Sequence, residues 1–177
     1  MRKLSLKELN RVDIDTFRQQ EKTPLVLVLD NIRSGLNVGA AFRTADAFAL
    51  QKIILCGITA KPPHREILKT AIGASQSVAW AYEKETEKAL ARLREEGFTL
   101  VAIEQAEGSV PLQSFQALPD KKYALIFGNE VIGVSAEVVN KVDACIEVPQ
   151  FGTKHSLNIA VCIGIVAWDL FKKMKLD

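Results

Sequence analysis

Short apolar segments alternate with helical segments along most of the chain, and this alternation limits the folds open to it. The first, at 24–29, is apolar at every position, which is typical of a strand buried on both faces of a sheet. Further strands are expected at 52–56, 77–82, 98–103, 123–127 and 145–148, and helices at 38–50, 65–71, 83–96 and 135–141. The pattern predicts an α/β fold with a mostly parallel sheet flanked by helices.

The composition is that of an ordinary globular protein, with 48% hydrophobic and 25% charged residues in 177 positions. The N-terminus lacks the apolar segment of a signal peptide. Cys56, Cys145 and Cys162 lie in apolar patterns without metal-ligand spacing, so we expect reduced thiols, no metal and a cytoplasmic protein. No apolar run is long enough to span a membrane, so no membrane partner is expected.

The N-terminal residues 1–22 carry all of the net charge of +2, with six basic and four acidic residues. We expect them to form a helical extension before a domain at 23–177. Ser5 and Glu8 suit a capping box, and Leu6, Leu9 and Phe17 suggest an amphipathic helix over 5–20. Two interpretations stay open: the helix packs on the domain or on a second subunit, or its basic face also contacts a polyanion.

The last third of the chain combines a strand end, a polar loop and an apolar helix. Pro149 ends the strand, and 150–155 form the loop. Ser156 suits the N-cap of the helix that follows. Every residue at 159–168 is apolar or glycine, which predicts a helix buried on all sides. Ser156 and Asn158 either cap this helix or face a ligand, because ligands bind beyond the carboxyl ends of strands.

Polar residues follow three of the predicted strands, in the groups Asn37 with Arg43, Gly128 to Glu130, and Ser156 with Asn158. Arg43 has apolar neighbours and needs an anion. It either pairs with Asp46 or Glu130 as a structural contact, or grips a phosphate or assists deprotonation of a reacting hydroxyl.

Several enzyme classes are disfavoured by the motifs that the chain lacks. Neither the dinucleotide fingerprint nor the P-loop motif occurs, which argues against a Rossmann dehydrogenase and a P-loop NTPase. The two histidines, His64 and His155, lie outside any recognisable triad context. Hydrolase chemistry is therefore not expected.

The three polar groups together resemble the SpoU (TrmH) family of RNA ribose 2′-O-methyltransferases, within the SPOUT superfamily. The resemblance lies in the segments NVGAAFRTAD at 37–46, FGNEVIGVS at 127–135, and VPQFG with SLNIA between 148 and 160. Their order and spacing match as well. One departure is Gln150-Phe151, where many relatives have methionine after the proline.

The resemblance implies a SPOUT-like fold with a deep C-terminal trefoil knot, and a homodimer whose site is completed across the interface. It also implies S-adenosyl-L-methionine as cofactor. The cofactor-binding residues would be Glu104, Phe127, Gly128, Asn129, Val148, Pro149 and Leu157.

By the same resemblance, Arg43 would activate the ribose 2′-hydroxyl with the help of an RNA phosphate. Asn37, Glu130, Ser156 and Asn158 would orient Arg43, the ribose and the cofactor. A compact core with short terminal extensions favours tRNA over rRNA as the RNA partner. The alternatives are an rRNA methyltransferase and a catalytically idle RNA-binding homologue.

Overall fold

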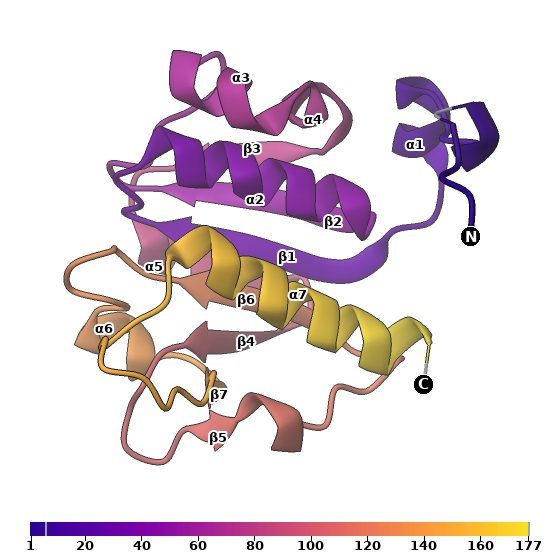
Figure 1. Cartoon of the computed structure of the whole chain (residues 1–177). Helices are drawn as coiled ribbons and strands as arrows, with labels where there is room; N and C mark the ends of the chain where they lie inside the picture. The colour runs from indigo at the N-terminus through magenta and orange to yellow at the C-terminus, as the bar shows by residue number, and fades with distance from the viewer. Residues whose placement is uncertain (6, 177) are drawn as a thin grey trace.

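A seven-stranded parallel sheet forms the centre of the computed structural model (Figure 1). Its strand order is β3-β2-β1-β6-β4-β7-β5, and every neighbouring pair is parallel. The structure describes residues 1–5 and 7–176. The expected α/β architecture is confirmed.

The strands lie close to where the apolar segments predict them. They are β1 Thr23–Asp30, β2 Leu50–Cys56, β3 Trp80–Glu83, β4 Phe98–Ile103, β5 Val110–Pro111, β6 Lys122–Phe127 and β7 Ala144–Glu147. The two-residue strand β5 was not expected, because so short a segment leaves no periodic pattern.

Helices cover both faces of the sheet (Figure 1). The α-helices are α1 Ile14–Gln19, α2 Gly35–Ala47, α3 Arg65–Ala71, α4 Ala74–Ser77, α5 Thr86–Glu95, α6 Ala136–Val139 and α7 Ile159–Lys175, with 3-10 helices η1 Lys7–Leu9 and η2 Leu112–Ser114. Helices α2, α3 and α7 lie on one face and α5 on the other.

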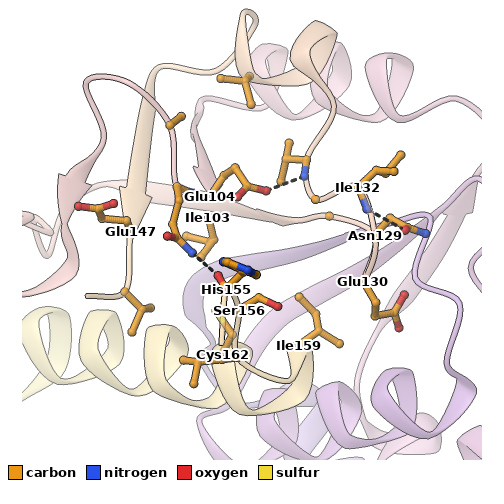
Figure 2. A pocket seen from close by; sticks show the side chains of 18 of the residues that line it. Ile103, Glu104, Asn129, Glu130, Ile132, Glu147, His155, Ser156, Ile159 and Cys162 are labelled. Carbon is orange, nitrogen blue, oxygen red and sulfur yellow. Dashed lines mark hydrogen bonds between the residues drawn. The ribbon is translucent and has the colours of Figure 1, made fainter. Parts of the chain in front are cut away.

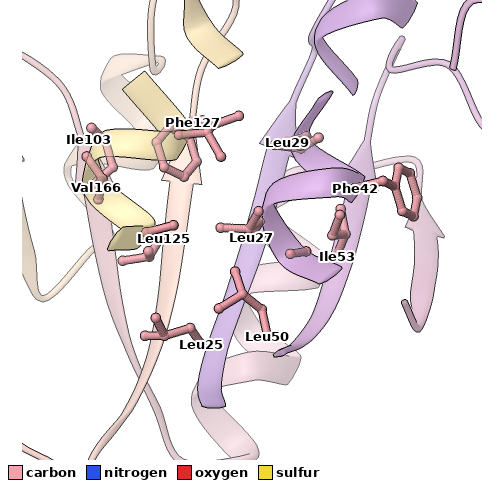
Figure 3. Packing of buried hydrophobic residues seen from close by; sticks show 14 of the residues in the cluster. Leu25, Leu27, Leu29, Phe42, Leu50, Ile53, Ile103, Leu125, Phe127 and Val166 are labelled. Atoms are coloured by element: carbon pink, nitrogen blue, oxygen red, sulfur yellow. The ribbon is translucent and has the colours of Figure 1, made fainter. Parts of the chain in front are cut away.

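The core is divided into two layers by the sheet itself. In β1, Leu25, Leu27 and Leu29 belong to the cluster under α2 and α7, whereas Val26 and Val28 belong to the cluster under α5. All five side chains are fully buried. Figure 3 shows how the leucines meet residues of β2, β6 and α7. A strand buried on both faces needs apolar residues at every position, which explains the uninterrupted run.

The prediction of one helix over 5–20 is wrong. The segment forms η1 and α1, and the chain turns between them at Asn10, whose φ is +46°. Asp13 caps α1 by accepting the N–H of Thr16. The Glu8 carboxylate does accept the Ser5 N–H, as a capping box requires, whereas Leu6 lies outside the described residues.

Helix α1 packs against α4 at the amino edge of the sheet (Figure 1). Phe17 is buried there, and the Arg18 guanidinium donates to the Gln76 carbonyl at 2.6 Å. These contacts support the interpretation that the N-terminal segment packs on its own domain. Contact with a polyanion stays a prediction.

Two expectations for α7 need correction. Its N-cap is Asn158 and not Ser156, because the Asn158 side chain accepts the N–H groups of Ala160 and Val161. The helix is also not buried on all sides. Val161, Ile165 and Trp168 are 39–52% exposed, so one apolar stripe faces outward.

The last strand, β7, lies between β4 and β5, both of which precede it in the chain. From β7 the chain returns across the end of the sheet to α7, which packs against α2 and β1 (Figure 1). The trefoil knot that the resemblance implies stays a prediction. No helix in residues 1–5 and 7–176 has the length and apolarity needed to cross a membrane.

Candidate active site

The strand register brings three polar segments to one edge of the sheet. Ile103 at the end of β4 pairs with Phe127 of β6 and with Ile146 of β7. The segments that follow these strands therefore start side by side, with Glu104 beside Gly128 and Glu147. This is the carboxyl edge, where ligands of open α/β sheets bind.

A cavity of about 830 Å³ opens among these segments (Figure 2). It is lined by the loop after β4, the loop between β6 and α6, part of α6, and the segment from β7 into α7. Its volume is within the range of small-molecule and cofactor sites. The loop between β7 and α7 stays in place partly because Gln105 Nε2 donates to the His155 carbonyl at 2.8 Å.

The cavity has an acidic wall. Glu104, Glu130 and Glu147 line it, and the described lining residues include no lysine or arginine. Burial raises the pKa of the Cys162 thiol, another lining group, to about 11, so this thiol is neutral. Such a lining favours a ligand that carries positive charge. Across the described part of the chain, no cluster of three or more His, Cys, Asp or Glu suits a metal ion.

The loop between β6 and α6 folds back on itself as a tight hairpin. The Asn129 and Gly133 backbones exchange two hydrogen bonds of 3.0 and 2.9 Å. A Cβ at Gly128 would lie 2.2 Å from the Gly133 carbonyl carbon, and Gly133 has a φ of +69°. Gly128 is therefore required for the close approach of two backbone segments, and Gly133 for its positive φ.

Glu104 holds this hairpin against the β4 loop. Its two carboxylate oxygens accept the N–H groups of Gln105 at 2.8 Å and Val134 at 2.9 Å. A Cβ at Gly133 would lie only 2.1 Å from Glu104 Oε2. The cavity wall is therefore set by one carboxylate that joins two loops.

Asn37 connects the two other polar groups. Its Nδ2 donates to Glu130 Oε1 at 3.3 Å, and its Oδ1 accepts Asn158 Nδ2 at 3.3 Å. The Glu130 carboxylate also accepts the backbone N–H groups of Arg33 at 2.9 Å and Ser34 at 3.1 Å. Hence Glu130, Asn37 and Asn158, which come from the three polar groups of the sequence, are linked by hydrogen bonds beside the cavity.

The chain matches the SpoU rRNA Methylase family over residues 24–168. It belongs to this family.

Relatives with named activities and a solved structure are similar to this SpoU-family chain. It is 30% identical to the 23S rRNA (guanosine-2′-O-)-methyltransferase RlmB of Vibrio parahaemolyticus, over 94% of this chain and 66% of that protein. It is 29% identical to the tRNA (guanosine(18)-2′-O)-methyltransferase of Borreliella burgdorferi, over 85% and 67%. The AdoMet-bound rRNA methyltransferase of Sinorhizobium meliloti superposes with a TM-score of 0.80 at 30% identity, over 93% and 60%.

The SpoU-family chain spans about two thirds of the length of these curated relatives. The similarity therefore covers only the part of each relative that aligns with this chain.

Most of the predicted site residues line the cavity. These are Glu104, Gly128, Asn129, Glu130, Val148, Ser156, Leu157 and Asn158. Asn37 lies behind the cavity and reaches it through Glu130 and Asn158. Phe127 is fully buried in the core, and Pro149 lies outside the lining.

Several lining residues were not expected from the sequence. They are Gln105, Ala106, Ile132, Val139, Asn140 and Cys162, among others. Gln105 and Ala106 directly follow a predicted strand, so their place at the carboxyl edge was a usable signal. Helix α6 gave no such signal, because its position depends on how the preceding hairpin folds.

Arg43 lies away from the cavity, on the outward face of α2. It is exposed, and it has no hydrogen bond or ion pair within the described residues. Asp46 instead accepts the Ser77 hydroxyl at 2.5 Å, and Glu130 is bound by the backbone of the β1–α2 loop. The interpretation that Arg43 pairs with Asp46 or Glu130 is therefore wrong.

The hydrogen bonds of Glu130 also fix its charge. Partial burial of the carboxyl acts to raise its pKa, but the N–H groups of Arg33 and Ser34, its own N–H group and the Asn37 amide together outweigh burial, so the pKa is lowered. The carboxylate is thus ionised at neutral pH and acts as a hydrogen-bond acceptor for these donors.

Replacing Glu130 by glutamine removes a charged hydrogen-bond acceptor and should lower the free energy of unfolding at pH 7 by about 1 kcal/mol. The loss is this small because solvent screens the hydrogen bonds at an exposed site. A lowered pKa stabilises the fold above the ordinary value of 4.5, and this contribution disappears as the pH falls through the lowered pKa. Urea unfolding of both proteins along a falling pH series should show the difference shrink. Glu107→Gln, at an exposed loop position, is the matched control. A difference that grows in acid would contradict this account.

Proposed function

We propose that the protein transfers a methyl group from S-adenosyl-L-methionine to a ribose 2′-hydroxyl of RNA. The observation that carries the proposal is the acidic cavity, with the Glu130–Asn37–Asn158 hydrogen-bonded chain at its side. The relatives named for this reaction and the similar structure with bound AdoMet support it.

The cavity suits the proposed cofactor in charge and in polarity. S-adenosylmethionine carries positive charge on its sulfonium and its amino group, and three carboxylates line the cavity. Ile103, Val148 and Leu157 offer apolar contacts to an adenosyl group. When bound, the cofactor supplies a methyl group that is activated by the sulfonium.

The chain's own residues then act mainly by positioning. Asn158 caps α7 while its amide donates to Asn37, so both side chains are held in one orientation. Ser156 is exposed beside them, and its hydroxyl has no partner among the described residues, so it is available to a ribose. Holding a 2′-hydroxyl in line with the methyl group converts a bimolecular step into an effectively unimolecular one, which contributes about 7–11 kcal/mol in favourable cases.

The exposed position of Arg43 supports a homodimer in which the site is completed by the partner. Arg43 follows Leu36 by seven residues, two helical turns, so both lie on the outward face of α2. The exposed Val161, Ile165 and Trp168 lie on the adjacent helix α7. A second copy packed on this apolar face would bury it and carry Arg43 toward the other subunit's cavity.

In that arrangement the Arg43 guanidinium holds an RNA phosphate next to the reacting ribose. A guanidinium offers five N–H donors in a planar fork that matches phosphate oxygens. Because it has no acceptor, it orients and stabilises charge, and the proposal gives it no role as a proton acceptor.

The RNA class is a separate part of the proposal. One relative is named for rRNA and another for tRNA at nearly equal identity, so both classes belong in any assay. The proposal puts tRNA first and keeps rRNA as the alternative. The free thiols of Cys56, Cys145 and Cys162 suit the reducing cytoplasm in which these RNAs are modified.

The direct test is calorimetric titration with S-adenosylmethionine, followed by transfer of a tritiated methyl group to bulk tRNA and bulk rRNA from cells that lack this gene. The proposal predicts saturable binding at one cofactor per subunit and label in one RNA class. Binding without transfer to either RNA would favour an idle RNA-binding homologue, and the lack of binding would contradict the proposal.

The role of Arg43 across the interface has its own test. Arg43→Ala should abolish methyl transfer and leave the cofactor affinity within about twofold, because the side chain is outside the subunit's own cavity. Ala106→Trp, which fills the cavity, should abolish cofactor binding and transfer. Co-expressed, the two inactive chains should restore about one quarter of wild-type activity, because half of the dimers are mixed and each has one intact site.

Circular dichroism and light scattering of both variants serve as controls for folding and assembly. If the mixed dimers form but stay inactive, Arg43 does not act on the partner's site. If Arg43→Ala loses cofactor binding and transfer together, its role is structural.

A further inference from the structure

The edge strand β3 carries an exposed aromatic and basic surface that the proposed reaction does not use. It consists of Ile58, Lys61, Trp80 and Tyr82, which we call the β3-edge patch. Trp80 and Tyr82 are 37% and 38% exposed, and Ile58 is 67% exposed. Strand β3 ends the sheet on this side (Figure 1), and none of the described strands pairs with its outer edge.

The two aromatic residues lie on one face of the strand. Trp80 pairs with Ile53 and Tyr82 with Leu55, and both partners belong to the core layer under α2 and α7. Residues two apart in a strand point to the same side and are about 7 Å apart. The rings therefore form a short ladder at the open edge of that layer.

The Tyr82 ring is fixed in place and paired with a cation. Its hydroxyl donates to the Gly57 carbonyl at 3.0 Å. Lys61 Nζ lies 4.0 Å from the ring centroid. The loop at 57–64, which contributes Ile58 and Lys61, contains no acidic residue. An ordered aromatic side chain with an adjacent lysine combines a stacking surface for a base with a contact for its phosphate.

Three of the four patch residues lie at the carboxyl edge of the sheet, where the cavity also lies, whereas Trp80 begins β3. Lys61 and Ile58 follow β2, and Tyr82 is next to the last residue of β3. Three strand spacings separate β3 from β6 and four separate it from β4, which is about 14–19 Å. A stacked RNA strand advances about 3.4 Å per nucleotide, so the patch is within about six nucleotides of the methylation site.

We propose that the β3-edge patch binds unpaired nucleotides that flank the methylated ribose. Trp80 and Tyr82 stack on bases and Lys61 contacts the phosphate between them. The inference rests on the proposed RNA methyltransferase function and adds to it that the substrate is recognised as a single strand, a loop or a bulge. Bases in a duplex are stacked on each other and have no free face for these rings.

The test measures binding of a fluorescent rU12 oligonucleotide and of a blunt 12-base-pair RNA duplex by anisotropy. Stacking on aromatic side chains tolerates any base, so rU12 is a suitable probe. The wild-type protein should prefer rU12. The double variant Trp80→Ile and Tyr82→Ile removes two stacking rings, so it should weaken rU12 binding by about 30-fold or more and leave the duplex nearly unchanged. Isoleucine keeps the strand propensity of both positions.

Two further variants separate stacking from general charge. Tyr82→Phe keeps the ring and should retain rU12 binding within about twofold. Lys61→Ala should reduce the salt dependence of rU12 binding by about 0.7 in the logarithmic slope, the value for one phosphate on a single strand. Lys121→Ala changes an exposed lysine just before β6, at the amino ends of the strands, and should change neither affinity nor slope.

Equal losses for rU12 and duplex, unchanged binding in the Ile double variant, or no rU12 binding by the wild-type protein would each contradict the inference. Capture of a protein strand by β3 without RNA binding would assign the edge to a protein partner instead. Methyl transfer unaffected by the double variant would overturn the inference and leave the proposed function intact. rU12 binding that depends on the two rings, in a protein without methyl transfer, would support the inference and contradict the proposed function.

Discussion

The site depends on one amide side chain that bridges distant parts of the chain. Asn37 bonds to Glu130, 93 residues away, and to Asn158, 121 residues away. Glu130 belongs to the hairpin that walls the cavity, and Asn158 caps the helix that closes it. Because each partner also bonds to backbone N–H groups, loss of the bridge would disturb loops as well as side chains. The cavity is thus held by a small number of fully used polar groups.

The cavity of a single subunit has acidic side chains in its lining but no lysine or arginine among the described residues. The cavity is lined by three carboxylates, whereas Arg43 is on the outward face of α2 beside an apolar stripe of α7. An RNA phosphate needs a cation close to the reacting ribose, and none lines this cavity among the described residues. In the homodimer that we propose, the second subunit supplies both the missing cation and the cover for the apolar stripe. The exposed Arg43 and the exposed Trp168 then have one explanation.

Much of the fold could be predicted from the sequence, because strands buried on both faces must be apolar throughout, as 24–29 is. The grouping of Asn37, Glu130 and Asn158 was also accessible, since the carboxyl ends of parallel strands share one edge. The local sequence pattern did not predict the N-cap or the exposed face of α7, because tertiary contacts determine both. Ser156 and Asn158 are both good caps, and only the fold selects Asn158. The outward stripe of α7 is apolar like its buried face, so the sequence hides it.

The central claim is the transfer of a methyl group to a ribose oxygen, and alkaline hydrolysis of the labelled RNA tests it most directly. Alkali cleaves RNA through the free 2′-hydroxyl, so a methylated ribose leaves its phosphodiester intact. We expect the tritium label in alkali-stable dinucleotides when the protein is incubated with labelled S-adenosylmethionine and its RNA. Label confined to mononucleotides would show methylation of a base and would contradict the account.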